Sequence, residues 1–212
     1  AASFQGCVKI VEELLNNDCI EMNKATDDGR TPLYAACQNG HLDVLEKLLE
    51  RREIEVNKAT KNGLTPLFIA CHRGHLEVAE KLLEQNEIEV NKATTDVGAT
   101  PLFIACQNGH LEIVDKLLEQ NEIEVNKAKN NGAAPLFIAC QIGHLDIVEK
   151  LLERNEIEVN RADIDGSTPL FMACQQGHLD VVEKLLERAE IEVNKATADN
   201  GATPLNVACL DG

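Results

Sequence analysis

A cysteine and a histidine recur four residues apart at five places in the 212-residue chain, and both residue types are common zinc ligands. The five pairs are Cys37 and His41, Cys71 and His75, Cys106 and His110, Cys140 and His144, and Cys174 and His178. A structural zinc ion needs four ligands, whereas each pair supplies two. Pairs in separate structural layers would lie about 10 Å apart, which is too far to complete a site. We therefore expect neither a metal nor another cofactor.

Other residues that could do chemistry lack the arrangement that catalysis requires. The sequence contains no phosphate-binding loop, no dinucleotide-binding glycine pattern and no pairing of a nucleophile with a base. Neighbouring charges such as Glu46 and Lys47 are typical of a solvated helix surface. We therefore predict that the protein is not an enzyme.

The charge balance limits the classes of partner. The chain has 36 acidic and 20 basic residues, which gives a net charge of −16 at pH 7. Such a protein gains little from the counterion release that drives binding to nucleic acid or from attraction to anionic membranes. No apolar run approaches the roughly 18 residues that would span a bilayer, and the first residues do not form a signal peptide. We expect no nucleic acid, no membrane insertion, and a cytoplasmic or possibly nuclear location.

The cysteine and histidine pairs belong to a sequence repeat of 34 or 35 residues. All six prolines precede leucine and lie 34 or 35 residues apart, at Pro32, Pro66, Pro101, Pro135, Pro169 and Pro204. Except at Ala134, a threonine precedes the proline. Threonine is a good helix N-cap and proline suits the first helical position, so each site predicts the start of a short helix. Six of the eight cysteines keep the same period, and we expect them to be reduced and buried: Cys37, Cys71, Cys106, Cys140, Cys174 and Cys209.

Each unit then continues with a second helix and a hairpin. In the third complete unit the first helix should end at Gly109, and the second should begin near Leu111. Asn121 is predicted to take the left-handed conformation after that helix. Asn131 and Gly132 are a strong short-hairpin signal.

These residues closely resemble the ankyrin repeat, whose hallmark is a hairpin glycine, Thr-Pro-Leu, an alanine pair, Gly-His, paired leucines and Val-Asn. In the first complete unit they are Gly29, Thr31 to Leu33, Ala36 and Cys37, Gly40 and His41, Leu48 and Leu49, and Val56 and Asn57. The family's histidine after Thr-Pro-Leu is an aromatic residue here, and its second alanine is cysteine. The resemblance implies an all-α repeat solenoid of stacked helix-turn-helix units with projecting β-hairpin loops.

We expect one elongated ankyrin-repeat domain over residues 1–212. Its units are a partial unit at 1–29, complete units at 30–63, 64–98, 99–132, 133–166 and 167–201, and a partial unit at 202–212. Gly6 to Leu15 aligns with Gly40 to Leu49, so the chain should open partway through a first helix. Neither end carries a polar cap, so we expect a segment of a longer array or a shortened form, with the last helix packed against something. Full exposure of both Leu205 and Val207 in a monomer would contradict that packing.

In the ankyrin family the first helices and the hairpins line a concave groove, and the second helices form the convex back. The five complete first-helix segments contain no Asp or Glu. The resemblance thus implies a mostly neutral, polar groove with acidic hairpins, suited to a partly basic or amide-rich peptide. Positions that vary between units supply the candidate partner contacts. They are Asp27, Asp28, Arg30, Gln38, Asn39, Lys61, Asn62, Leu64, His72, Arg73, Thr95, Asp96, Val97, Gln107, Asn108, Asn130, Asn131, Gln141, Ile142, Ile164, Asp165, Ser167, Gln175 and Gln176.

Within this set, four apolar residues are the expected anchors of an interface: Leu64, Val97, Ile142 and Ile164. His72 and Arg73 form a local basic spot and are the best single candidate for a partner contact. A second resemblance concerns Leu49 to Asn57, which is similar to the pattern that asparaginyl hydroxylases recognise in ankyrin repeats. Here we favour an asparagine that binds loop backbone through its side chain.

The function expected from these features is a non-catalytic protein-protein interaction module, or scaffold, that binds a partner in the concave groove. Two alternatives stay open. One is a structural spacer within a longer ankyrin array, with end-to-end self-association through uncapped termini. The other is an engineered ankyrin-type scaffold.

Overall fold

The computed structural model describes residues 2–210, and over that range it contains twelve α-helices and no strand. Helix α1 (Ala2–Leu15) comes first. Six inner helices follow the prolines, namely α2 (Pro32–Asn39), α4 (Pro66–Arg73), α6 (Pro101–Asn108), α8 (Pro135–Ile142), α10 (Pro169–Gln175) and α12 (Pro204–Leu210). Five outer helices alternate with them, namely α3 (Leu42–Leu49), α5 (Leu76–Leu83), α7 (Leu111–Leu118), α9 (Leu145–Leu152) and α11 (Leu179–Leu186). The predicted repeat and its all-α solenoid are confirmed.

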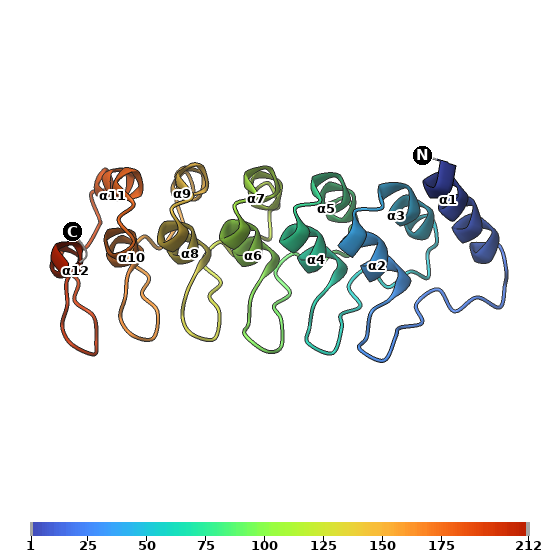
Figure 1. The fold of residues 1–212 in the computed structure, drawn as a ribbon, viewed down its shortest axis with the longest axis horizontal. Coiled ribbons are helices and arrows are strands. Elements are labelled where there is room, and N and C mark those ends of the chain that lie inside the picture. The colour runs from blue at the N-terminus through green and yellow to red at the C-terminus, as the bar shows by residue number, and fades with distance from the viewer. Residues whose placement is uncertain (1, 211–212) are drawn as a thin grey trace.

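The helices form two parallel rows, and a loop projects from the inner row before each inner helix (Figure 1). Each inner helix contacts the next inner helix, and each outer helix contacts the next outer helix, with α1 in the outer row against α3. No helix in the described range is long and apolar enough to cross a bilayer. The main helix contacts thus join neighbours in the stack, as expected for a solenoid.

The inner helices begin and end where the sequence predicted. The Thr100 hydroxyl accepts a hydrogen bond from the Phe103 N–H at 3.1 Å, and Pro101 occupies the first turn. Such a cap contributes about 1 kcal/mol. Ala134 makes no side-chain cap bond. Gly109 ends α6 with φ of 75°, in the left-handed region that glycine tolerates best.

The ends of the outer helices differ from the expectation. Helix α7 ends at Leu118, and the capping residue Glu119 has φ of −67°. In the described range only glycines have positive φ, so the prediction of a left-handed Asn121 was wrong. The reason is that the chain continues in right-handed turns. The Gln120 N–H bonds to Leu117 O at 3.1 Å, and the Ile123 N–H bonds to Gln120 O at 3.2 Å. These tighter bonds use the free carbonyls of the helix end without a left-handed residue.

Helix α1 also departs from the expected start. It runs unbroken through Gly6, where the alignment with later units predicted a helix end. A glycine inside a helix costs only about 1 kcal/mol, and the residues before Gly6 carry no Thr-Pro start that would define a separate inner helix. The chain therefore opens with a helix of the outer row.

Four of the eight cysteines lie in the core between the rows, whereas Cys7 and Cys19, outside the repeated position, are exposed. All eight are free thiols. Cys37, Cys71, Cys106 and Cys140 are buried, as predicted, and burial raises the pKa of each thiol far above its usual range. Cys174 is half-buried and Cys209 is exposed, because α12 packs on α10 and the described residues cover no other side of it. The expectation of six buried cysteines is corrected to four.

Candidate functional site

Six loops, which we call fingers 1 to 6, precede the six inner helices. They comprise residues 26–30, 60–64, 94–99, 129–133, 163–167 and 197–202. A backbone hydrogen bond between the first and last residues closes each finger, such as Thr94 N–H to Ala99 O at 2.9 Å. Fingers 3 and 6 contain the extra residue that the sequence placed at the tip. The predicted hairpins are thus present as tight loops.

A hydrogen bond also joins each finger to the next. The bonds run from Lys61 N to Asp28 O (3.1 Å), Thr95 N to Asn62 O (3.0 Å), Asn130 N to Val97 O (3.0 Å), Ile164 N to Asn131 O (2.9 Å) and Ala198 N to Asp165 O (2.8 Å). The fingers pack so closely that a Cβ on Gly63, whose φ is 80°, would lie 2.6 Å from Thr95 N. Because their backbones are fixed, the fingers present their side chains at set positions.

The opposite ends of the inner helices are held by the repeated histidines. The His75 Nε2 lies 3.2 Å from Gln38 O, His178 Nε2 lies 3.2 Å from Gln141 O, and His110 Nε2 lies 3.4 Å from His72 O. Each of these rings sits against the glycine that ends the previous inner helix. In the described range no three His, Cys, Asp or Glu side chains gather as a metal would require. These histidines therefore act between units, each at the start of an outer helix.

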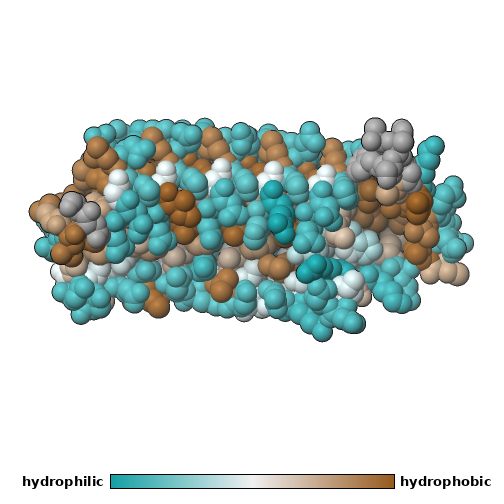
Figure 2. Space-filling view, viewed as in Figure 1, coloured by the Kyte–Doolittle hydropathy of each residue, from teal (hydrophilic) through white to brown (hydrophobic). Residues whose placement is uncertain are grey.

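Most predicted contact residues lie on the fingers and on the inner-helix ends, and we call their exposed members the variable surface. It comprises Asp27, Asp28, Arg30, Asn39, Lys61, Asn62, His72, Arg73, Thr95, Asp96, Val97, Asn108, Asn130, Asn131, Ile142, Ile164, Asp165 and Gln176. Four glutamines of the set are half-buried: Gln38, Gln107, Gln141 and Gln175. The molecular face in Figure 2 is mostly hydrophilic along its length, with larger hydrophobic areas toward the two ends.

Two predicted contacts are not exposed. Leu64 is half-buried against the core, so it is not the exposed anchor that was expected. Ser167 is buried, because its N–H bonds at 2.9 Å to the Asp163 carboxylate that closes finger 5. Val97, Ile142 and Ile164 are exposed by 43, 40 and 70%, respectively.

The basic groups of the variable surface centre on finger 2 and α4. Lys61 and Arg73 are exposed and form no ion pair with any residue in the described range. His72 packs edge-on against Phe68 with 6.4 Å between ring centres, and burial together with the nearby Arg73 lowers its pKa. Further along, the Lys129 ammonium lies 5.0 Å from the centre of the Phe103 ring. This surface is therefore not uniformly acidic, despite the net charge.

The outer row carries a separate ladder of charges. A lysine on each outer helix pairs with an acid on the previous outer-row helix, as in Lys116 with Glu80 at 3.3 Å and Lys184 with Glu149 at 3.2 Å. These side chains are about one-third to two-fifths exposed, so each pair contributes little alone. The acidity of the outer helices is thus partly compensated within that row.

Sequence reasoning missed the partners of the asparagines in the outer loops. The Asn91 side chain donates to Glu122 O at 2.6 Å and accepts from Glu124 N–H at 2.9 Å. Asn23, Asn57, Asn126 and Asn160 each make the same two bonds to the loop that follows the next outer helix. We had expected an asparagine that binds loop backbone, and the structure places that backbone in the next unit. The constant spacing of Val-Asn was the only sequence signal.

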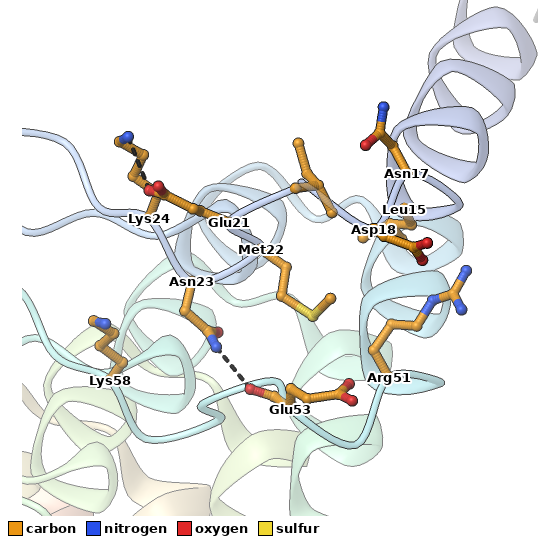
Figure 3. A pocket seen from close by; sticks show the side chains of 11 residues that line it. Leu15, Asn17, Asp18, Glu21, Met22, Asn23, Lys24, Arg51, Glu53 and Lys58 are labelled. Carbon is orange, nitrogen blue, oxygen red and sulfur yellow. Dashed lines mark hydrogen bonds and ion pairs between the residues drawn. The ribbon is translucent and has the colours of Figure 1, made fainter.

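The hollows between these loops are open. One of about 660 Å³ lies between residues 15–24 and the loop after α3, and Figure 3 shows Met22 pointing into it beside Asn23 and Arg51. Arg51 donates to the Asn16 side chain at 3.0 Å. None of the predicted contact residues lines this hollow. It is a gap between units and brings together no chemical groups that suggest catalysis.

Comparisons with known proteins agree with this architecture. A family model described as ankyrin repeats (3 copies) matches residues 1–94, 87–163 and 156–212. A search of curated proteins finds no significant match. The matched segments span the whole chain, and the protein belongs to the ankyrin-repeat family.

Proposed function

We propose that the protein is a non-catalytic interaction module that binds a partner protein on the variable surface, in the concave groove expected between the fingers and the inner helices. Ankyrin repeats are generally protein-protein interaction modules. One observation carries the proposal. The residues that differ between units are exposed on fingers whose backbones are hydrogen-bonded to one another. A surface that is already ordered loses little conformational entropy on binding.

The apolar content of this surface supports the same proposal. Val97, Ile142 and Ile164 are exposed but lie in different units, among amides and charges. Isolated apolar residues on a polar surface are suited to anchoring a partner without causing aggregation. Free thiols and the absence of a disulfide among residues 2–210 support a reducing location, which we propose to be the cytoplasm or the nucleus.

A paired-variant experiment tests the groove. The double variant Arg73→Glu and Ile142→Asp alters two exposed residues of the variable surface. The matched control, Arg52→Glu with Ile20→Asp, makes the same chemical changes at exposed residues away from it. Partners recovered by affinity purification from source cells should be lost with the first variant and kept with the control. Equal recovery with both variants would refute the groove as the binding surface.

A second candidate, end-to-end association, is favoured by the apolar face beyond α10 and α11. Leu179, Leu205 and Leu210 are 68, 72 and 79% exposed, and a hollow of about 500 Å³ lies between α10, α11 and α12. Full exposure of both Leu205 and Val207 would have contradicted the expected packing of the last helix. Leu205 is largely exposed, whereas Val207 is only 6% exposed. We propose that another ankyrin-type face stacks here. Sedimentation should show association that Leu205→Glu with Leu210→Glu abolishes, and a concentration-independent monomer would refute it.

A further inference from the structure

We propose that the variable surface around finger 2 and α4 recognises an acidic stretch of the partner, with aspartate or glutamate side chains. This inference rests on the proposed function and names the chemistry of the bound segment. It reverses the sequence-based expectation of a basic or amide-rich peptide for this part of the surface.

The first step is the distribution of ion pairs. Fourteen of the twenty lysines and arginines form an ion pair within the described range. The six without one are Lys9, Arg51, Arg52, Lys61, Arg73 and Lys129. Three of those six, Lys61, Arg73 and Lys129, lie on fingers 2 and 4 or at the end of α4. Half of the unpaired basic residues therefore lie on the fingers or at the end of an inner helix.

The second step concerns the acids on the neighbouring fingers, of which Asp28 and Asp96 already have partners within their own fingers. Asp28 on finger 1 pairs with Arg30 at 2.7 Å. Asp96 on finger 3 accepts the Val97 N–H at 2.7 Å, and a hydrogen bond from Thr94 lowers the pKa of its carboxyl. Helices α4, α6 and α8 contain no Asp or Glu. Asp27 on finger 1 is exposed, but no carboxylate in the described range forms an ion pair with Lys61 or Arg73.

The third step is that the basic groups are held in place. Asn108 donates to His72 O at 2.9 Å, which ties the end of α6 to the end of α4 beside Arg73. The Lys61 N–H is bonded to finger 1, and Lys129 rests over the Phe103 ring. Cations on a fixed backbone can bind carboxylates with less ordering than mobile surface lysines.

The other end of the surface has the opposite charge. Finger 5 carries the exposed Asp165, which forms no ion pair in the described range, and neither finger 5 nor finger 6 has a lysine or arginine. Three layers separate finger 2 from finger 5, which is about 30 Å at about 10 Å per layer. An extended peptide would cover that distance with about nine residues. We therefore infer a bound segment that is acidic over finger 2 and α4 and basic about nine residues away.

Selection from a random 16-residue displayed peptide library on the full chain tests the inference. Selected peptides should be enriched in Asp and Glu relative to the library. Lys61→Glu with Arg73→Glu should weaken their binding at least tenfold, raised salt should weaken it too, and Arg52→Glu should not. Circular dichroism verifies that each variant is folded.

The experiment distinguishes a failure of the acidic-partner inference from a failure of the proposed function. Peptides that lose binding with Ile142→Asp but show no acidic enrichment would overturn the acidic partner and leave the groove intact. Peptides whose binding is unchanged by every variant of the surface would overturn the proposed function itself. Acidic peptides that bind the Lys61 and Arg73 variant as well as the unmodified chain would also overturn the acidic partner.

Discussion

The asparagines of the outer loops should contribute much of the coupling between units, and Asn91 is the best place to measure it. Its side chain makes one hydrogen bond as donor and one as acceptor, both to the loop of the following unit. A hydrogen bond contributes about 0.5–1.5 kcal/mol net, so Asn91→Ala should lower the free energy of unfolding by about 2 kcal/mol. For a urea slope of about 3 kcal/mol/M, the unfolding midpoint should fall by about 0.7 M.

The chain contains its own control for this change. Asn194 occupies the same position in the last complete unit, is exposed, and makes no side-chain hydrogen bond to the residues that the structure describes. Asn194→Ala should therefore change the midpoint little. Amide exchange gives a local measure, because Glu124 N–H should exchange faster in Asn91→Ala while Glu158 N–H, which is bonded to Asn126, should not. Equal destabilisation by the two alanine variants would refute the reasoning.

Three further predictions concern single positions. Gly109→Ala should destabilise more than Gly177→Ala in chemical denaturation, since both have positive φ but only at Gly109 would the new Cβ meet a histidine ring, at 2.8 Å. Ala134→Thr should raise stability by about 1 kcal/mol, because it adds the hydroxyl cap that the other complete units have; an unchanged midpoint would contradict this. Iodoacetamide at pH 8 should label Cys209 but leave Cys106 unmodified until the chain unfolds, because burial raises the pKa of that thiol; mass spectrometry measures both.

Features that depend on local backbone chemistry could be predicted from the sequence. Thr100 and Pro101 start α6, and Gly109 ends it, because caps and a left-handed terminus require particular residues at particular positions. The prediction of a left-handed Asn121 was wrong because the chain leaves the outer helix through tight right-handed turns, which no single residue dictates. The predicted helix end at Gly6 was also wrong, because a glycine alone does not end a helix.

The candidate surface was predictable as a set of positions but not in its electrostatics. Variation between units pointed to the fingers and inner-helix ends, which depend only on the register of the repeat. Whether Arg73 has a carboxylate partner depends on neighbouring units, as does the burial of Leu64 and Ser167. The sequence showed an acidic protein, whereas the structure shows that Lys61 and Arg73 on the variable surface have no ion-pair partner in the described range.

The bonds between fingers bear on how such a chain can change in length. Every bond runs from a backbone N–H near one tip to a backbone carbonyl near the previous tip, so it does not depend on which side chains either finger carries. Finger 3 has an extra residue and still makes the bond, through Val97 O. A gene duplication that copied one whole unit between two others would find the same donors and acceptors on both sides. The protein could thus acquire new recognition residues by duplication and divergence while the scaffold between them stayed the same.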